Sequence, residues 1–197
     1  SAADGINGEE LWTSDGTPIG TYLFKDIYAG PASSWPRGLK AVGDRLFFSA
    51  DDGRTGSELW TSDGIPDGTY LVKDILPGWR GRSGRNLTAV GARLFFAASD
   101  GVTGDELWTS DGTPEGTSML KDIRPGLNGS RPGWLTAVGD RLLLSADDGA
   151  SGYELWTSDA TSEGTCLVKD IRPGPEGSAP QWLGAIANPL FVSADDG

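Results

Sequence analysis

The chain of 197 residues contains no histidine and only one cysteine, Cys166. Without histidine it lacks the commonest general base and the commonest zinc ligand, and no Ser-His or Cys-His pair can form. A single cysteine excludes an intrachain disulfide, so packing has to stabilise the fold. Cys166 also stands at a repeat position that other copies fill with Tyr22, Tyr70 and Ser118, which argues against a nucleophilic thiol. We therefore expect a protein that is not an enzyme.

Basic residues are also scarce: 16 Lys and Arg stand against 28 Asp and Glu, and the formal net charge is −12. An acidic chain of this kind is repelled by phosphate, so we expect no nucleic-acid partner and no anionic membrane surface. No apolar run approaches the roughly 18 residues of a membrane span, so no membrane insertion is expected. The start lacks an initiator Met, a basic segment and an apolar segment, which is typical of a mature or excised piece.

The most prominent feature of the chain is a repeat. Glu-Leu-Trp-Thr-Ser-Asp occurs four times at a spacing of 48 residues, and each copy continues to Gly-Thr and Lys-Asp-Ile. The four copies begin at Glu10, Glu58, Glu106 and Glu154. Periods of about 20–50 residues are typical of solenoids, propellers and arrays. Thirty glycines and twelve prolines indicate many turns between short strands.

One repeat contains four short β-prone runs separated by Gly, Asp and Pro. In one copy these runs are Leu135–Val138, Leu142–Ala146, Glu154–Thr157 and Thr165–Ile171. They predict a four-stranded antiparallel meander, which buries its apolar faces only against neighbouring copies. Because propeller blades are about 40–50 residues long, we predict an all-β fold, a β-propeller of four four-stranded blades.

The phase of the repeat predicts how the ring closes. The chain begins just before a third strand and ends just after a second strand. We therefore expect one domain, 1–197, with blades at about 39–75, 87–123 and 135–171, and a composite blade of 183–197 plus 6–27. Strands 182–186 and 190–194 would pair with strands 10–13 and 22–27. A fragment of a longer array and two chains forming an eight-bladed ring are the alternatives, and the mass in solution distinguishes them.

Residues that recur in every copy are expected to be structural. The tryptophan of the third strand should fill the space between neighbouring blades, and the glutamate two residues before it should make a structural hydrogen bond. Asp and Ser of the following turn should bond the backbone two residues on, with Gly at a positive φ. The lysine of Lys-Asp-Ile should protect the outer strand from pairing with other chains.

Acidic loops between the second and third strands predict a candidate cofactor, Ca²⁺. The pattern Asp-Asp-Gly-x-x-Gly-x-Glu supplies carboxylate and turn carbonyl oxygens, which Ca²⁺ prefers. The candidate metal ligands are Asp51, Asp52, Glu58, Asp100, Asp147 and Asp148. Asp and Gly also form turns without any metal, so both interpretations stay open.

The segment after Lys-Asp-Ile differs most between copies, and this variation predicts the ligand-binding residues. The candidates are Trp35, Trp79, Trp134, Trp182, Arg80 and Arg85. Aromatic side chains on loops with polar neighbours suit sugars or protein partners. The alternative is that these tryptophans only cover blade edges.

The Glu-Leu-Trp-x-x-Asp-Gly-Thr core resembles the ELWxxDGT repeat of bacterial secreted and surface proteins. The resemblance covers the whole chain and includes Lys-Asp-Ile-x-Pro-Gly and Leu-Phe-Phe-x-Ala, with departures at Ile65 and Ala160. It implies a secreted or cell-surface protein whose repeats often form long arrays. We expect a non-catalytic, lectin-like module for a glycan or an extracellular protein. The alternative is a structural repeat unit that self-associates in a surface or filamentous assembly.

Overall fold

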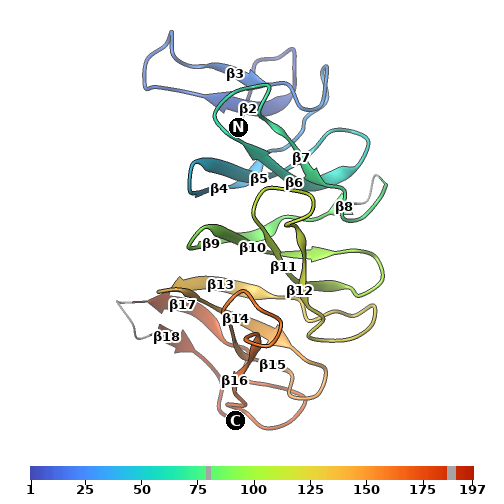
Figure 1. Cartoon of the computed structure of the whole chain (residues 1–197), viewed down its shortest axis with the longest axis vertical. Coiled ribbons are helices and arrows are strands. Elements are labelled where there is room, and N and C mark those ends of the chain that lie inside the picture. The colour runs from blue at the N-terminus through green and yellow to red at the C-terminus, as the bar shows by residue number, and fades with distance from the viewer. Residues whose placement is uncertain (79–80, 186–189) are drawn as a thin grey trace. The chain divides into compact units, whose positions relative to one another are not determined.

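The computed structural model describes residues 1–78, 81–185 and 190–197, which form β-strands joined by turns and loops (Figure 1). Two compact units, Ser1–Arg85 and Asn86–Gly197, make up the chain. None of the described residues belongs to a helix of the length and apolarity that a membrane span requires.

The first unit contains two sheets. A three-stranded sheet consists of β1 (Ala2–Ala3), β2 (Glu9–Thr13) and β3 (Tyr22–Lys25). A second sheet consists of β4 (Arg37–Val42), β5 (Arg45–Asp51), β6 (Gly56–Ser62) and β7 (Tyr70–Lys73). The short strand β8 (Gly81–Arg82) is added to this sheet in parallel to the start of β6.

The chain from residue 85 onward forms two complete antiparallel meanders and a hairpin. The first meander consists of β9 (Arg85–Val90), β10 (Arg93–Ser99), β11 (Asp105–Ser110) and β12 (Ser118–Lys121). The second consists of β13 (Gly133–Val138), β14 (Arg141–Asp147), β15 (Tyr153–Ser158) and β16 (Cys166–Lys169). The hairpin consists of β17 (Gln181–Ala185) and β18 (Leu190–Ser193).

The predicted all-β fold of four-stranded antiparallel meanders is confirmed in the three complete sheets (Figure 1). Tight turns join first and second strands, with Gly43, Gly91 and Gly139 at φ of 59°, 57° and 60°. The predicted pairing of the last hairpin with β2 and β3 is absent among the described strands. Here β18 pairs with β17, and β2 pairs with β1 and β3. Closure of the ring therefore stays a prediction.

Apolar side chains of successive sheets share one core within each unit, because a single sheet cannot cover both of its own faces. In the second unit the cluster consists of Val90, Phe95, Leu107, Ile123, Leu142, Leu144, Ala146 and Trp156. These residues come from both meanders. In the first unit Leu11 and Ile27 pack with Phe48, Ala50 and Trp60. The expected placement of the repeated tryptophan between neighbouring sheets is confirmed for Trp60 and Trp156.

The turn between third and fourth strands has the predicted side-chain hydrogen bonds. Asp111 Oδ1 accepts from the Thr113 amide at 2.9 Å, and Ser110 Oγ accepts from the Gly112 amide at 3.0 Å. Gly112 has a φ of 92°. In the last copy Ala160 takes this position with a φ of 72°, where an L-residue costs about 1–2 kcal/mol.

Two lysines of Lys-Asp-Ile, Lys25 and Lys121, contact the next repeat, in addition to standing on an outer strand. Lys25 Nζ donates to the Pro66 carbonyl at 2.9 Å. Lys121 Nζ donates to the carbonyls of Thr165 at 2.6 Å and Ser162 at 3.3 Å. Both acceptor sites lie around the turn between third and fourth strands, so these lysines connect neighbouring sheets.

Candidate functional site

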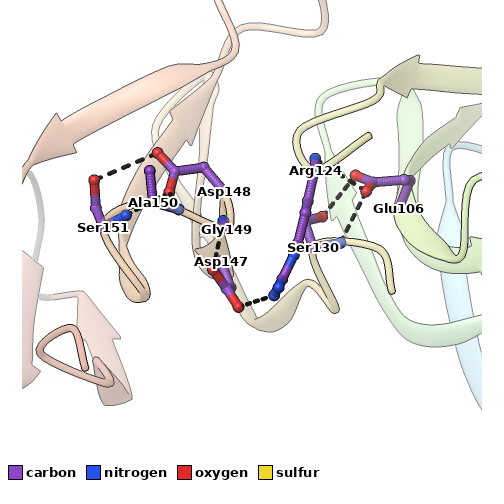
Figure 2. A network of polar contacts seen from close by, with 8 residues as sticks. All are labelled: Glu106, Arg124, Ser130, Asp147, Asp148, Gly149, Ala150 and Ser151. Carbon is purple, nitrogen blue, oxygen red and sulfur yellow. Dashed lines mark hydrogen bonds and ion pairs between the residues drawn. The ribbon is translucent and has the colours of Figure 1, made fainter. Parts of the chain in front are cut away.

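One completely buried glutamate in each repeat holds the loop that follows the fourth strand. The four are Glu10, Glu58, Glu106 and Glu154. The Glu106 carboxylate accepts from the amides of Ile123 at 3.0 Å, Arg124 at 3.2 Å and Ser130 at 2.8 Å. It also accepts from Ser130 Oγ at 2.6 Å (Figure 2). The predicted structural hydrogen bonding of this glutamate is therefore confirmed.

The second repeat departs from this arrangement. Glu58 accepts from the amides of Ile75 at 3.2 Å and Leu76 at 3.4 Å, both longer than the bonds to Glu106. At the sequence position of Ser130 this repeat has Arg82. Burial raises the pKa of the Glu58 carboxyl to about 7, and the hydrogen bonds that it accepts offset only part of this effect. Burial also raises the pKa of Glu106.

We expect the Glu58→Gln variant to lose part of the pH dependence of stability between about pH 5 and pH 8. The folded pKa of about 7 lies above the ordinary 4.5. The stabilisation from the protonated form is therefore complete below pH 4.5 and is lost as the pH rises through 7. Urea denaturation should show that the difference in free energy of unfolding between wild type and variant changes by about 2 kcal/mol from pH 5 to pH 8. Parallel pH profiles would contradict it.

A groove of about 360 Å³ lies in the second unit, within the range of roughly 300–1,000 Å³ typical of small-ligand sites. It is lined by Arg131, Gly133, Trp134, Ser145, Tyr153, Ala179, Pro180 and Gln181. Trp134 and Tyr153 supply aromatic surface. Arg131 and Gln181 supply hydrogen-bonding groups at the same opening.

Trp134 is presented to this groove by an unusual backbone. It has a φ of 55° within a β-bulge between Gly133 and Thr136, and its side chain is 42% exposed. Two earlier repeats fill this position with Gly38 and Asn86, residue types that suit the left-handed region, and the last copy has Trp182 there. A tryptophan there gives up stability, and bulges often re-aim side chains at functional sites.

The loop that carries Arg131 is anchored on two sides. The Arg131 amide donates to the Asp105 carbonyl at 2.9 Å, next to the Glu106 contact. The Asp147 amide donates to the Ser130 carbonyl at 3.0 Å, and the Asp147 carboxylate pairs with the Arg124 guanidinium (Figure 2). This wall of the groove is therefore held in place without a ligand.

The opposite wall repeats the same anchors one repeat later. The Glu154 carboxylate accepts from Ser178 Oγ at 2.6 Å, and the Tyr153 carbonyl accepts from the Ala179 amide at 2.9 Å. Arg172 pairs with Asp195 at 2.7 Å, as Arg124 pairs with Asp147. Since both walls are already fixed, the loops of the protein would lose little conformational entropy when a ligand binds.

Among the predicted ligand-binding residues whose side chains the structure describes, Trp134 alone lines the groove, together with residues that the sequence did not single out. Trp35 is 50% exposed in the first unit, and the Arg37 guanidinium lies 5.6 Å from its ring centroid. Arg85 is exposed at the start of β9. Trp79, Arg80 and the side chain of Trp182 lie outside the described residues.

Arg131, Tyr153 and Gln181 were missed by the sequence reasoning. Each stands at a variable repeat position: the counterparts of Arg131 are Trp35, Ser83 and Ala179. This variation was the available signal, although nothing in it indicates that three side chains up to 50 positions apart meet.

The predicted calcium ligands lie in turns that their own backbone satisfies. Asp52 Oδ1 accepts from the amides of Arg54 at 2.8 Å and Thr55 at 2.9 Å. Asp148 accepts in the same way from Ala150 and Ser151, as Figure 2 shows. Burial acts to raise the pKa of Asp52, but the hydrogen bonds from Thr55 and Arg54 outweigh it and lower this pKa.

The other aspartates among the candidate calcium ligands also accept hydrogen bonds from the backbone of their own turns. Asp100 accepts from the amides of Val102 and Thr103, and Asp51 and Asp147 each accept from a glycine amide two residues on. Glu58 faces the interior. In the described parts of the chain no three Asp, Glu, Cys or His side chains gather closely enough to hold a metal ion. Calcium binding stays a prediction, and the structure does not bring its proposed ligands together.

No protein-family model and no curated protein matches the chain. Among solved structures it is similar to a puromycin hydrolase mutant complexed with PGG, with a TM-score of 0.55 and 15% identity, over 81% of this chain and 25% of the hydrolase chain. It is also similar to a structure from an analysis of two prolyl endopeptidases, with a TM-score of 0.54 and 14% identity, over 92% and 29% of the two chains. The chain thus spans less than a third of either protein. At these identities the likeness concerns the fold alone, which is propeller-like.

Proposed function

We propose that the chain is a non-catalytic extracellular module that binds glycans in the groove beside Trp134. The observation that carries the proposal is a half-exposed tryptophan, held in a left-handed backbone conformation at a groove with polar groups. The apolar face of a sugar ring packs well on an indole, and hydroxyl groups find partners in Arg131, Gln181 and Tyr153. The extracellular location rests on the resemblance to secreted repeats.

Binding is favoured over catalysis by the groups that surround the groove. None of the eight described lining residues carries a carboxylate, thiol or imidazole. The nearest glutamate in the sequence, Glu154, is completely buried, and its oxygens accept four hydrogen bonds. A general acid or base has to reach the substrate, which Glu154 does not.

Glycan binding is tested on an array, followed by calorimetric titration of the best binder. Trp134→Ala should weaken binding at least about tenfold, because the stacking surface is removed. Tyr22→Ala is the matched control, since Tyr22 is 53% exposed and lies outside the groove. Unchanged affinity of a folded Trp134→Ala variant would overturn the assignment of the site.

We further propose that β17–β18 and β2–β3 are the two halves of one blade. The hairpin supplies first and second strands, and β2–β3 supply third and fourth strands. Phe191 is 59% exposed, whereas its counterparts Phe47 and Phe95 are 1% exposed and Leu143 is partly buried. Trp12 is likewise less buried than Trp60 and its other counterparts. Strand β1 pairs only with Glu9 and Glu10 of β2, so exposed apolar residues on β18 and on the remainder of β2 favour a partner strand.

Within one chain this pairing closes a four-bladed ring, and between chains it builds an eight-bladed ring or an open array. The second case supports the other candidate function, a structural repeat unit of a surface or filamentous assembly. Light scattering after size exclusion should give 20.7 kDa for the closed ring and twice that mass for the dimer. We expect the mass of the monomer. We also expect the Phe191→Asp variant to be less stable than the wild type. Species that grow with concentration would favour the assembly.

A further inference from the structure

Arg131 gives the groove a charge opposite to that of the whole protein. The chain has 28 acidic residues and a net charge of −12, yet none of the eight lining residues is acidic and Arg131 is the only charged one. A site with a net positive charge on an acidic protein attracts ligands that carry negative charge.

The guanidinium of Arg131 differs from its neighbours in having no carboxylate partner. Arg124 pairs with Asp147, and Arg172 pairs with Asp195 and Glu176. Within the described part of the chain, no hydrogen bond or ion pair of the Arg131 side chain occurs. Its planar fork of donors is therefore available to a carboxylate or sulfate group.

The backbone of Arg131 is fixed beside the aromatic residue Trp134 of the groove. Arg131 has a φ of 50°, the conformation that Trp35 and Ala179 also have at this repeat position. Three of the four copies therefore share this conformation while their side chains differ, and Ser83 of the second copy does not share it. Because Ser130 and the Arg131 amide are anchored to Glu106 and Asp105, the guanidinium stem starts from a fixed point beside Trp134.

We infer that the groove selects acidic oligosaccharides, with a carboxylate or sulfate group held by Arg131 while a sugar ring packs on Trp134. This inference rests on the proposed glycan binding and adds the class of glycan. The guanidinium forms two parallel hydrogen bonds with such an anion, a geometry that a neutral hydroxymethyl group does not match. Gln181 and Tyr153 remain for the uncharged hydroxyl groups.

The test uses oligosaccharides of equal length and linkage in three forms. One form is neutral, one carries a 6-carboxylate and one carries a 6-sulfate. The acidic forms should bind at least about tenfold more tightly than the neutral form. Preference for one acidic form identifies the anion. Arg131→Gln should reduce the affinity for acidic forms to that for the neutral form, and Arg131→Lys should give an intermediate value.

Arg141→Gln is the control for net charge, since it removes one exposed arginine that does not line the groove. It should leave all affinities unchanged. Equal binding of neutral and acidic forms, lost in Trp134→Ala, would overturn the inference and leave the proposed function standing. Binding of no glycan by the wild-type chain would overturn both. If Arg131→Gln and Arg141→Gln weakened the affinity for acidic forms equally, the preference would come from long-range electrostatic attraction. That result would also overturn the inference.

Discussion

Replacing Trp156 by alanine is expected to destabilise the protein by about 3–5 kcal/mol. Its side chain is only 7% exposed and packs in a cluster with Leu142, Leu144 and Ile123. These residues come from two successive meanders. The substitution therefore removes contacts on both sides of an inter-sheet layer and leaves a cavity that neither sheet can close alone.

Urea denaturation followed by far-ultraviolet circular dichroism measures this loss. Trp134→Ala is the matched control, because Trp134 lies in the same unit but is 42% exposed, and we expect it to cost less than about 1 kcal/mol. Trp156→Phe should cost less than Trp156→Ala, since the buried Trp156 ring N–H has no acceptor among the described residues. Equal losses for Trp156→Ala and Trp134→Ala would contradict the inter-sheet role.

Replacing Glu106 by glutamine is expected to destabilise the protein by about 3 kcal/mol, although the two side chains have the same shape. Its carboxylate accepts from three amides and a hydroxyl, those of Ile123, Arg124 and Ser130. An amide group turns an NH₂ toward one pair of these donors. Buried donors then face a donor and lose their acceptor.

Glu115→Gln is the control, because Glu115 is exposed and the charge change is the same. Equilibrium denaturation reports the overall loss, and hydrogen exchange of the Ser130 and Arg131 amides reports the loop directly. Exchange should accelerate in Glu106→Gln and stay unchanged in Glu115→Gln. A Glu106→Gln variant of native stability with a protected Ser130 amide would mean that the loop is held by other contacts.

The local fold was predictable because each repeat encodes its own strands and turns in adjacent residues. The turn at Asp111 and Ser110 needs only side chains that bond the backbone two residues away. The roles of Trp156 and Glu106 followed from their recurrence, since a residue present once per repeat is required by a contact made once per repeat. Strand order within each meander followed from the short turns.

The site was predictable only in part. Trp134 was found because tryptophan is conspicuous in a variable loop. Arg131 and Gln181 were not, because their significance depends on two consecutive loops forming opposite walls of one groove. Likewise, the lack of an acidic partner for Arg131 is a property of its surroundings, which the sequence does not display.

The sequence by itself determined the strands, the turns, the repeat length and the buried positions of Glu and Trp. Hydrogen bonds across a few residues and the alternation of apolar side chains are encoded within each 48-residue copy. Only the tertiary structure decided which variable side chains share a groove and which arginines are neutralised. The physical reason is that these properties arise where neighbouring repeats pack, and there the side chains of two copies, rather than the pattern within one, set distance and charge.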